Sequence, residues 1–263
     1  MEFLPYLVAT PALQQRLCLA PLGHSFAAQR IFDPMRRASA PFLDRLEQLD
    51  AATFGREGMA MPRWAFYDCA ELPGAVLGLA ARAAEVPEEL RSNFGKVSDA
   101  ELVPLSMYMA IPTLTEHEWL GFSLCAFDVA AAFLGAAIDV ATLALSVATL
   151  RARQVTGTVQ WGSRHLSATA RFAPLSVLAA HLPAHTRAAT CVFRFEANAA
   201  CIERALADTP PILGDIQWLA AGDTQMHQAA QMRIEAGQRA SIVGQPETRD
   251  GSQHIPLHWE AAP

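Results

Sequence analysis

The stretch "AAFLGAAIDVATLALSVATLRARQVTGTVQW", residues 131–161, contains the least polar part of the chain, and the interpretation of the whole sequence depends on it. Three interpretations are open: a membrane span, a buried helix followed by a strand, or a helix whose glycine- and alanine-rich start receives the phosphates of a cofactor. Residues 138–152 suit a helix in each case, because Arg151 and Arg153 complement the negative end of its dipole.

The apolar run is nearly long enough for a membrane span, which needs about 20 residues. Asp139 lies near its middle and Asp128 at one end. A carboxylate costs about 2.5–3.5 kcal/mol at the centre of an inserted helix. Much of the remaining apolarity is alanine, which favours insertion weakly, and no aromatic belt flanks the run. We therefore favour a buried helix and expect no membrane partner.

Composition and charge exclude several function classes. The chain has 263 residues, enough for one large domain or a domain with an appendage. Its formal net charge of −6 and the absence of a basic stripe argue against a nucleic-acid partner. Five widely spaced cysteines without a CxxC pair predict reduced thiols, a cytoplasmic location and no metal site. The N-terminus has no basic residues before its apolar ones, so we expect no secretory signal.

The elements on either side of the stretch 131–161 predict a mixed sheet with helices. Before it, a helix over 40–55, a strand, turn and strand over 63–81, a polar insertion over 84–101 and strands over 102–112 and 118–128 are expected. After it come strand 155–161, a short helix opened by Ser163, strands 175–183 and 189–197, and a further helix. This order predicts an α/β (α+β) domain over residues 1–197, with a C-terminal helix and irregular appendage over 198–263.

The segment "AFLGAA", residues 132–137, and its flanking elements resemble the core of a known superfamily. A strand, this loop, an apolar helix, a strand, a short helix and "RFAPLSVL" are similar in order and spacing to the GNAT superfamily of acyl-CoA-dependent acyltransferases, over about residues 56–195. In that family a [Q/R]xxGx[G/A] loop holds the pyrophosphate of coenzyme A at a helix start. The chain keeps the glycine and the final alanine but lacks the Gln or Arg, and Thr169 stands where the family often has a tyrosine acid.

The resemblance implies a cofactor and a set of catalytic residues. The expected cofactor is an acyl-CoA or acyl-carrier thioester, bound by the backbone amides of Leu134, Gly135, Ala136 and Ala137. The alternative is that Gly135 only lets the helix pack closely. On the strand 118–128, Trp119, Gly121, Ser123 and Cys125 are expected on one face and Asp128 on the other, which places Cys125 or Asp128 near the thioester. A small buried core thiol explains Cys125 equally well.

Further candidates come from the residues themselves. Tyr108, beside Ser106, could donate a proton, or it could be a buried tyrosine with a satisfied hydroxyl. Gln160 lies at the carboxyl end of a strand, where pockets of α/β sheets open. His181 and His185 have HxxxH spacing, but Pro183 separates them, so a metal is not expected. The candidate catalytic residues are Tyr108, Cys125, Asp128 and Gln160, and the candidate substrate-binding residues are Tyr67, Trp119, Trp161 and His181.

Three function classes remain open at this point. The first is acyl transfer from a thioester to a small amine or hydroxyl. The second is a GNAT-like scaffold used for other chemistry on a small metabolite, such as decarboxylation or rearrangement, and the missing Gln/Arg and tyrosine favour it. The third is a non-catalytic ligand-binding or assembly protein. A small-molecule substrate is the expected partner in the first two, and formation of a homodimer is left open.

Overall fold

The computed structural model describes residues 1–22, 30–55, 59–129, 136–184, 189–207 and 215–260. The chain divides into two compact units, residues 1–152 and 153–263. Each unit is described by itself. The predicted boundary after residue 197 falls inside the second unit.

The first unit is built on a mixed sheet whose described strands lie in the order β2-β1-β3-β5-β6. The β1–β2 pair is parallel, the other neighbours are antiparallel, and β4 pairs with the end of β3. The strand β3 is buried along nearly its whole length, as expected for a strand covered on both faces. The strands are β1 (Leu4–Val8), β2 (Ile31–Phe32), β3 (Ala75–Arg82), β4 (Leu102–Pro104), β5 (Ser106–Pro112) and β6 (Glu118–Ala126).

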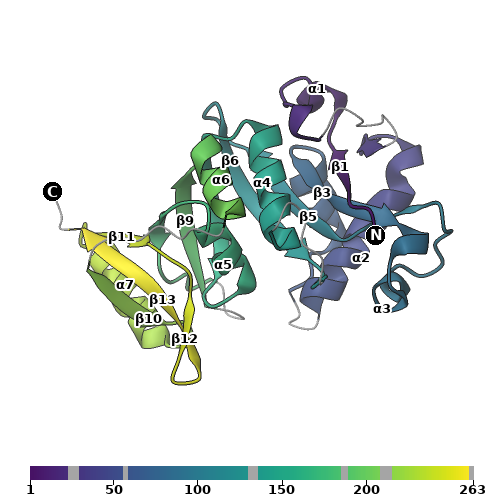
Figure 1. Cartoon of the computed structure of the whole chain (residues 1–263). Helices are drawn as coiled ribbons and strands as arrows, with labels where there is room; N and C mark the ends of the chain where they lie inside the picture. Colours follow the sequence, from purple (N-terminus) through teal and green to yellow (C-terminus); the bar gives the residue numbers. More distant parts are fainter. Residues whose placement is uncertain (23–29, 56–58, 130–135, 185–188, 208–214, 261–263) are drawn as a thin grey trace. The chain divides into compact units, whose positions relative to one another are not determined.

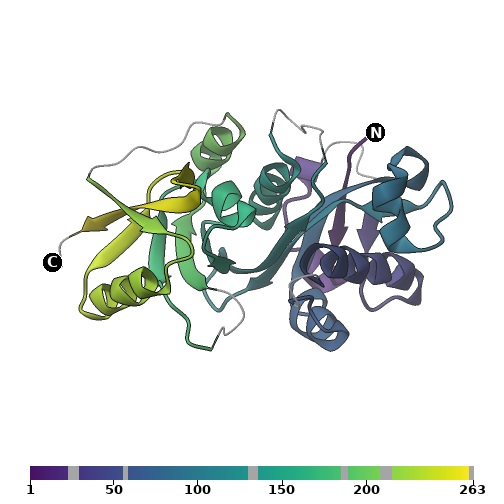
Figure 2. The same ribbon diagram turned by 90° about the horizontal axis from the view of Figure 1, so that it is seen from below.

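Helices cover both faces of this sheet. The helix α2 (Ala40–Phe54) and the helix α4 (Ile138–Leu150) lie on opposite faces, as Figures 1 and 2 show. Two shorter helices, α1 (Pro11–Gln14) and α3 (Glu88–Arg91), lie at the periphery of the unit. The mixed sheet with helices on its faces confirms the predicted α+β class.

The helix α4 forms the middle of the apolar stretch 131–161. All of its residues except Ala148 are buried, and the hydroxyls of Thr142 and Ser146 donate to backbone carbonyls one turn earlier. Arg151 ends the helix in the left-handed conformation, with φ of 50°. The prediction of a buried helix is therefore confirmed. Among the helices in the described part of the chain, none is long and apolar enough to cross a bilayer.

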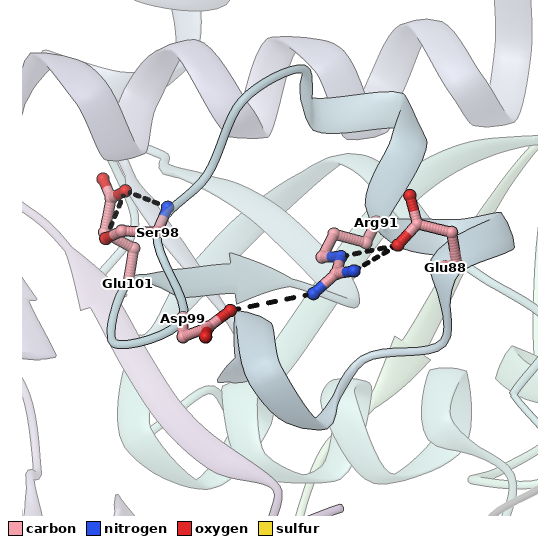
Figure 3. A network of polar contacts seen from close by, with 5 residues as sticks. All are labelled: Glu88, Arg91, Ser98, Asp99 and Glu101. Carbon is pink, nitrogen blue, oxygen red and sulfur yellow. Dashed lines mark hydrogen bonds and ion pairs between the residues drawn. The ribbon is translucent and has the colours of Figure 1, made fainter.

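The polar insertion predicted over 84–101 contains α3 and a network of short polar contacts (Figure 3). Arg91 contacts Glu88 and Asp99, and Ser98 donates from its backbone and its hydroxyl to Glu101. Arg45 of α2 pairs with the same Glu101 and donates to the Leu102 carbonyl at 3.1 Å. The hydrogen bonds from Ser98, with that from Arg45, lower the pKa of Glu101 to about 2. The insertion is thus attached to α2 through Glu101.

The second unit contains an antiparallel sheet in the order β7-β9-β8-β11-β13-β10, with β12 paired to β13. Ser163 accepts a hydrogen bond from the Leu166 amide at 3.2 Å, which confirms the predicted helix start. The strands are β7 (Gln154–Gln160), β8 (Leu175–Ala179), β9 (Thr190–Glu196), β10 (Ile216–Ala220), β11 (Arg239–Ile242), β12 (Glu247–Arg249) and β13 (Ser252–Glu260), and the helices are α5 (Arg164–Ala170), α6 (Ala199–Leu206) and α7 (Thr224–Glu235).

Two predicted elements were wrong. The first half of 63–81 is not a strand but a π-helix, Ala65–Glu71, in which the Leu72 amide donates to the Tyr67 carbonyl five residues earlier. Seven residues are too few for their polarity pattern to distinguish a strand from a helical turn. The region 222–254 is not irregular, since it contains α7, β11 and β12 and the start of β13. The buried side of α7 consists of only His227 and Ala230, so its sequence shows little periodicity.

Candidate functional site

Glu71 is the most unusual acidic side chain of the first unit. It ends the π-helix, only 2% of it is exposed, and its Oε1 has no hydrogen-bond partner among the described residues. Gly74, three residues later, lets the chain pass β5 closely, because a Cβ there would lie 2.3 Å from the Ala110 carbonyl oxygen. π-Helical turns are uncommon and occur frequently at functional sites. The turn thus holds a carboxyl group inside the protein without a stabilising donor.

The surroundings of Glu71 favour its protonated form. Burial and, to a smaller extent, the negative charges of Glu47 and Asp44 on α2 raise the pKa of Glu71, Arg63 lowers it, and together they bring it to about 8. Arg63 is itself shared between these two acids, at 2.7 Å from Asp44 and 3.3 Å from Glu47. A carboxyl group with a pKa near 8 can accept or donate a proton close to neutral pH.

A phenol and a thiol lie in the same region as Glu71. Tyr6 of β1 is fully buried, and its hydroxyl donates to the Ser106 carbonyl at 2.8 Å. Burial raises the pKa of Tyr6, and the next contributions come from Cys125 and then Glu71, so the three groups are electrostatic neighbours. Cys125 of β6 is also fully buried. The region therefore combines a carboxyl group of raised pKa with two weaker acids.

Other buried acids of the first unit are satisfied by backbone donors. Asp50 is 2% exposed and accepts a hydrogen bond from the Met61 amide at 2.6 Å. Asp139 is 5% exposed and accepts one from the Val140 amide at 2.9 Å. Within the described residues, Glu71 is the buried acid that retains an unpaired oxygen. The sequence places Glu71 in the predicted strand, turn and strand over 63–81 and does not single it out, because the lack of a hydrogen-bond donor beside its Oε1 is visible only in the folded unit.

Tyr108 lies in the interior of the sheet. It is 4% exposed on β5, paired with Leu77 of β3 and Leu124 of β6, and burial raises the pKa of its hydroxyl well above the ordinary value. The hydroxyl has no hydrogen-bond partner among the described residues. It occupies the space above Gly121, where a Cβ would lie 2.4 Å from the oxygen. The alternative of a buried tyrosine with a satisfied hydroxyl does not hold, and the proton-donor role stays a prediction.

We expect Tyr108→Phe to stabilise the protein, by about 1 kcal/mol, because it removes a buried hydroxyl that lacks a partner. Tyr6→Phe is the matched control, since it removes a buried hydroxyl that donates to the Ser106 carbonyl and should cost about 1 kcal/mol. Urea unfolding of the two variants measures both effects. Destabilisation by Tyr108→Phe as large as that by Tyr6→Phe would show that the Tyr108 hydroxyl does have a partner in solution.

The residues predicted to share one face of β6 do not share it. A bulge follows Met109 of β5, so that Ser123 pairs with Met109 and Gly121 pairs with Ala110. The intervening residue of β6 has no partner, and such a bulge reverses the alternation of side chains along the strand. Trp119 and Gly121 therefore lie on one face, and Ser123 and Cys125 on the other. Asp128, two residues beyond the strand, is exposed.

The predicted cofactor-binding segment is described only in part. Leu134 and Gly135 lie outside the described residues, Ala136 is 2% exposed, and Ala137 is exposed and precedes the first turn of α4. Asp139 already accepts the Val140 amide of that turn. A carboxylate in the first turn is stabilised by the helix dipole but repels a phosphate that would use the same amides. This arrangement weakens the case for pyrophosphate binding at Ala136 and Ala137.

In the second unit, two of the predicted substrate-binding residues come together around a histidine. Trp161 is 6% exposed, its Nε1 donates to the Ala180 carbonyl at 2.9 Å, and its ring stacks on that of His227 with centroids 5.2 Å apart. His227 is fully buried, and neither ring nitrogen has a hydrogen-bond partner among the described residues. Burial lowers the pKa of His227. The backbone of Ala220 and the charge of Asp223 raise it, His181 lowers it, and the net pKa is below the ordinary value.

The remaining predicted residues of the described chain, Gln160, Tyr67 and Trp119, lie on β7, the π-helix and β6. Gln160 ends β7 opposite Thr190. Tyr67 of the π-helix is half-buried, and its hydroxyl donates to the Pro34 carbonyl at 3.3 Å. Tyr67 and Trp119 belong to the first unit, whereas Trp161 and His181 belong to the second. Sequence reasoning missed His227, because a lone histidine on a polar helix carries no signal of its own.

Within the described residues, no group of three or more His, Cys, Asp or Glu side chains could hold a metal ion. His185, the second histidine of the HxxxH spacing, lies outside the described residues. The candidate sites described above are the acid–base groups of the first unit and the aromatic contacts of the second. No protein-family model matches the sequence, and no curated protein matches it either.

Proposed function

We propose that the first unit is the catalytic part of an enzyme acting on a small molecule, with Glu71 as the proton-transfer group. The reaction that fits best is acyl transfer from an acyl-CoA or carrier-protein thioester to a small amine or hydroxyl. The observation that carries this proposal is the buried carboxyl of Glu71, with an unpaired oxygen and a pKa of about 8.

The chemistry of acyl transfer requires a group of this kind. The amine nitrogen attacks the thioester carbonyl, a C–N bond forms, and the C–S bond breaks. The attacking amine must lose a proton, and the departing thiolate must take one up. A carboxylate whose pKa lies near 8 is a stronger base than an ordinary carboxylate, and its acid form is still able to return the proton to sulfur.

The order of elements supports a GNAT-like scaffold. After β6 the chain continues through α4, β7, the short helix α5 and β8, which is the order on which the resemblance of the sequence to that superfamily rests. Up to β6 the order is β1, α1, β2, α2, the π-helix, β3, α3, β4, β5 and β6. A shared order of elements does not by itself imply a reaction, and the proposed reaction depends on Glu71.

A second candidate is proton-transfer chemistry on a small metabolite without a phosphate-bearing donor, such as decarboxylation or rearrangement. Asp139 favours it, because its carboxylate accepts the Val140 amide in the turn where a pyrophosphate was predicted. Glu71 would have the same role as proton donor or acceptor. The two candidates differ in whether the protein binds coenzyme A.

Turnover by the purified protein tests the role of Glu71. With a panel of acyl-CoA donors and small amines, release of free thiol should rise with pH and level off above about 8, as Glu71 loses its proton. Glu71→Gln should lower kcat at least about 100-fold, the usual effect of losing a general base. Glu47→Gln is the control: it removes a charge that raises the pKa of Glu71, so the midpoint of the pH profile should move to lower pH at an unchanged plateau.

The outcomes separate the candidates. Equal kcat for Glu71→Gln and wild-type protein contradicts the role of Glu71 in any reaction. Calorimetric titration with CoA and acyl-CoA distinguishes the two reactions. Heat of binding supports acyl transfer from acyl-CoA, and its absence from wild-type protein overturns that donor. Titration with an acyl-carrier-protein thioester tests the other donor, and no heat with either donor overturns acyl transfer and leaves the second candidate, to be assayed with small carboxylic acids as substrates.

A further inference from the structure

The second unit contains a small cavity between α7 and the strands β10 and β13. Its volume is about 80 Å³. Figures 1 and 2 show α7 lying along one face of these strands. Apolar side chains form most of the wall, among them Leu219, Met226 and Leu257, and the polar part of the lining includes Arg233. Trp259 of β13 also lines the cavity.

Arg233 brings a positive charge to this cavity without an acidic partner. Its guanidinium carbon lies 3.6 Å from the centre of the Trp259 ring. Its Nε donates to Gln238 at 2.6 Å and its Nη1 to Gln217 at 2.9 Å, and both acceptors are uncharged amide oxygens. Among the described residues, no carboxylate pairs with Arg233 and its Nη2 has no acceptor. The buried Nε1 of Trp259 also lacks a described acceptor, which adds to the positive potential of the wall.

A second arginine–tryptophan pair in the same unit shows what Arg233 lacks. Arg249 lies 3.4 Å from the centre of the Trp218 ring, in the same stacked arrangement. Its guanidinium also forms an ion pair with Glu247, with 3.0 Å between the Arg249 Nη2 and the Glu247 Oε2. Stacking on an indole leaves the edge of a guanidinium free for a carboxylate, and Glu247 supplies one to Arg249. At Arg233 no described carboxylate takes this place, and Arg233 lines the cavity.

We infer that this cavity binds a small organic carboxylate with a short apolar tail. The carboxylate takes the free edge of the Arg233 guanidinium, and the tail contacts Leu219, Met226 and Leu257. On this measure a single water needs about 10–15 Å³, so the cavity has room for a ligand of roughly five to seven heavy atoms. Complementary charge selects the carboxylate over an amine or an amide of the same shape. This site is independent of Glu71 and of any acyl transfer.

Titration with n-butyrate, followed by the indole NMR signals of ¹⁵N-labelled protein, tests the inference. The Trp259 signal, assigned from Trp259→Phe, should shift and saturate with a dissociation constant on the order of 1 mM. Butyramide, the uncharged analogue, and n-butylamine should bind at least about tenfold more weakly. Arg233→Gln should weaken butyrate binding at least about tenfold. Arg249→Gln, the matched control at the paired stack, should change it less than about twofold.

Arg233→Lys is a second variant, in case Arg233→Gln fails to fold. It keeps the positive charge and changes the shape of the side chain. It should retain a preference for butyrate over butyramide, with weaker binding than wild-type protein. Wild-type protein that shows no saturable shift of the Trp259 signal overturns the inference. So does equal affinity for butyrate and butyramide, or equal loss of butyrate affinity in Arg233→Gln and Arg249→Gln.

Discussion

Replacing Glu71 with glutamine should raise the free energy of unfolding at pH 9 by about 4 kcal/mol, with little difference from wild-type protein at pH 4. The folded state holds the proton of Glu71 up to a pKa of about 8, whereas the unfolded chain releases it near 4.5. The folded state thus binds the extra proton between these values, and wild-type stability falls as pH rises through that window. Glutamine does not titrate, so the free energy of unfolding of the variant does not fall over this pH range for this reason.

Urea unfolding followed by circular dichroism from pH 4 to 9 measures this effect. Glu89→Gln is the control, because Glu89 lies exposed on α3 and its substitution should leave the pH dependence unchanged. An effect of about 4 kcal/mol is a large part of the total stability of a typical domain, about 5–15 kcal/mol. If the curves of wild-type and Glu71→Gln protein run parallel over this range, Glu71 is not held protonated in the folded state.

Gly78→Ala should destabilise the protein by about 3 kcal/mol or more, and a large part of the variant should fail to fold. A Cβ on Gly78 would lie 2.0 Å from the Ser106 carbonyl oxygen and 2.6 Å from the Tyr6 hydroxyl oxygen. These two atoms are already joined by a 2.8 Å hydrogen bond. To remove the clash with the new Cβ, either that hydrogen bond must break or the β5 backbone must shift. A close-packed interior accommodates neither change easily.

Gly55→Ala is the matched control for this prediction. Nothing lies within 4 Å of a Cβ at Gly55, and its φ of −63° suits any residue. Its melting temperature should stay within a few degrees of that of wild-type protein, while Gly78→Ala should melt far lower or be insoluble. Similar melting temperatures for all three proteins would mean that β1, β3 and β5 are not packed as closely as described.

Local sequence patterns were sufficient for the elements whose stability comes from their own periodicity and ends. The apolar run with Asp139 predicted a buried helix rather than a membrane span, and α4 is buried on nearly all sides. Ser163 predicted a helix start, and its side chain caps α5. The strands β5, β6, β8 and β9 fall within the predicted segments, and β7 begins one residue before its predicted segment. In each case the signal lies within one element, where a sequence can be interpreted without its partners.

Patterns that depend on a neighbouring element were predicted less well. The bulge opposite Met109 reverses the faces of β6, so that Trp119 and Cys125 separate although their spacing predicts a shared face. The helix α7 was missed because its sequence is polar on nearly every side, and its place is defined by contacts of His227 with Trp161. Neither a strand register nor a ring stack is visible in one segment alone.

By itself the sequence determined the α+β class, the burial of α4 and the cap of α5, because hydrophobic periodicity and capping act over one or two helical turns or a single strand. Only the tertiary structure decided the candidate site. An acidic residue at position 71 acquires a pKa near 8 because burial in the folded unit removes water from it and the charges of Glu47 and Asp44 on α2 act on it. Desolvation and electrostatic interaction depend on distance in space and not on separation along the chain, so they arise only when the elements meet.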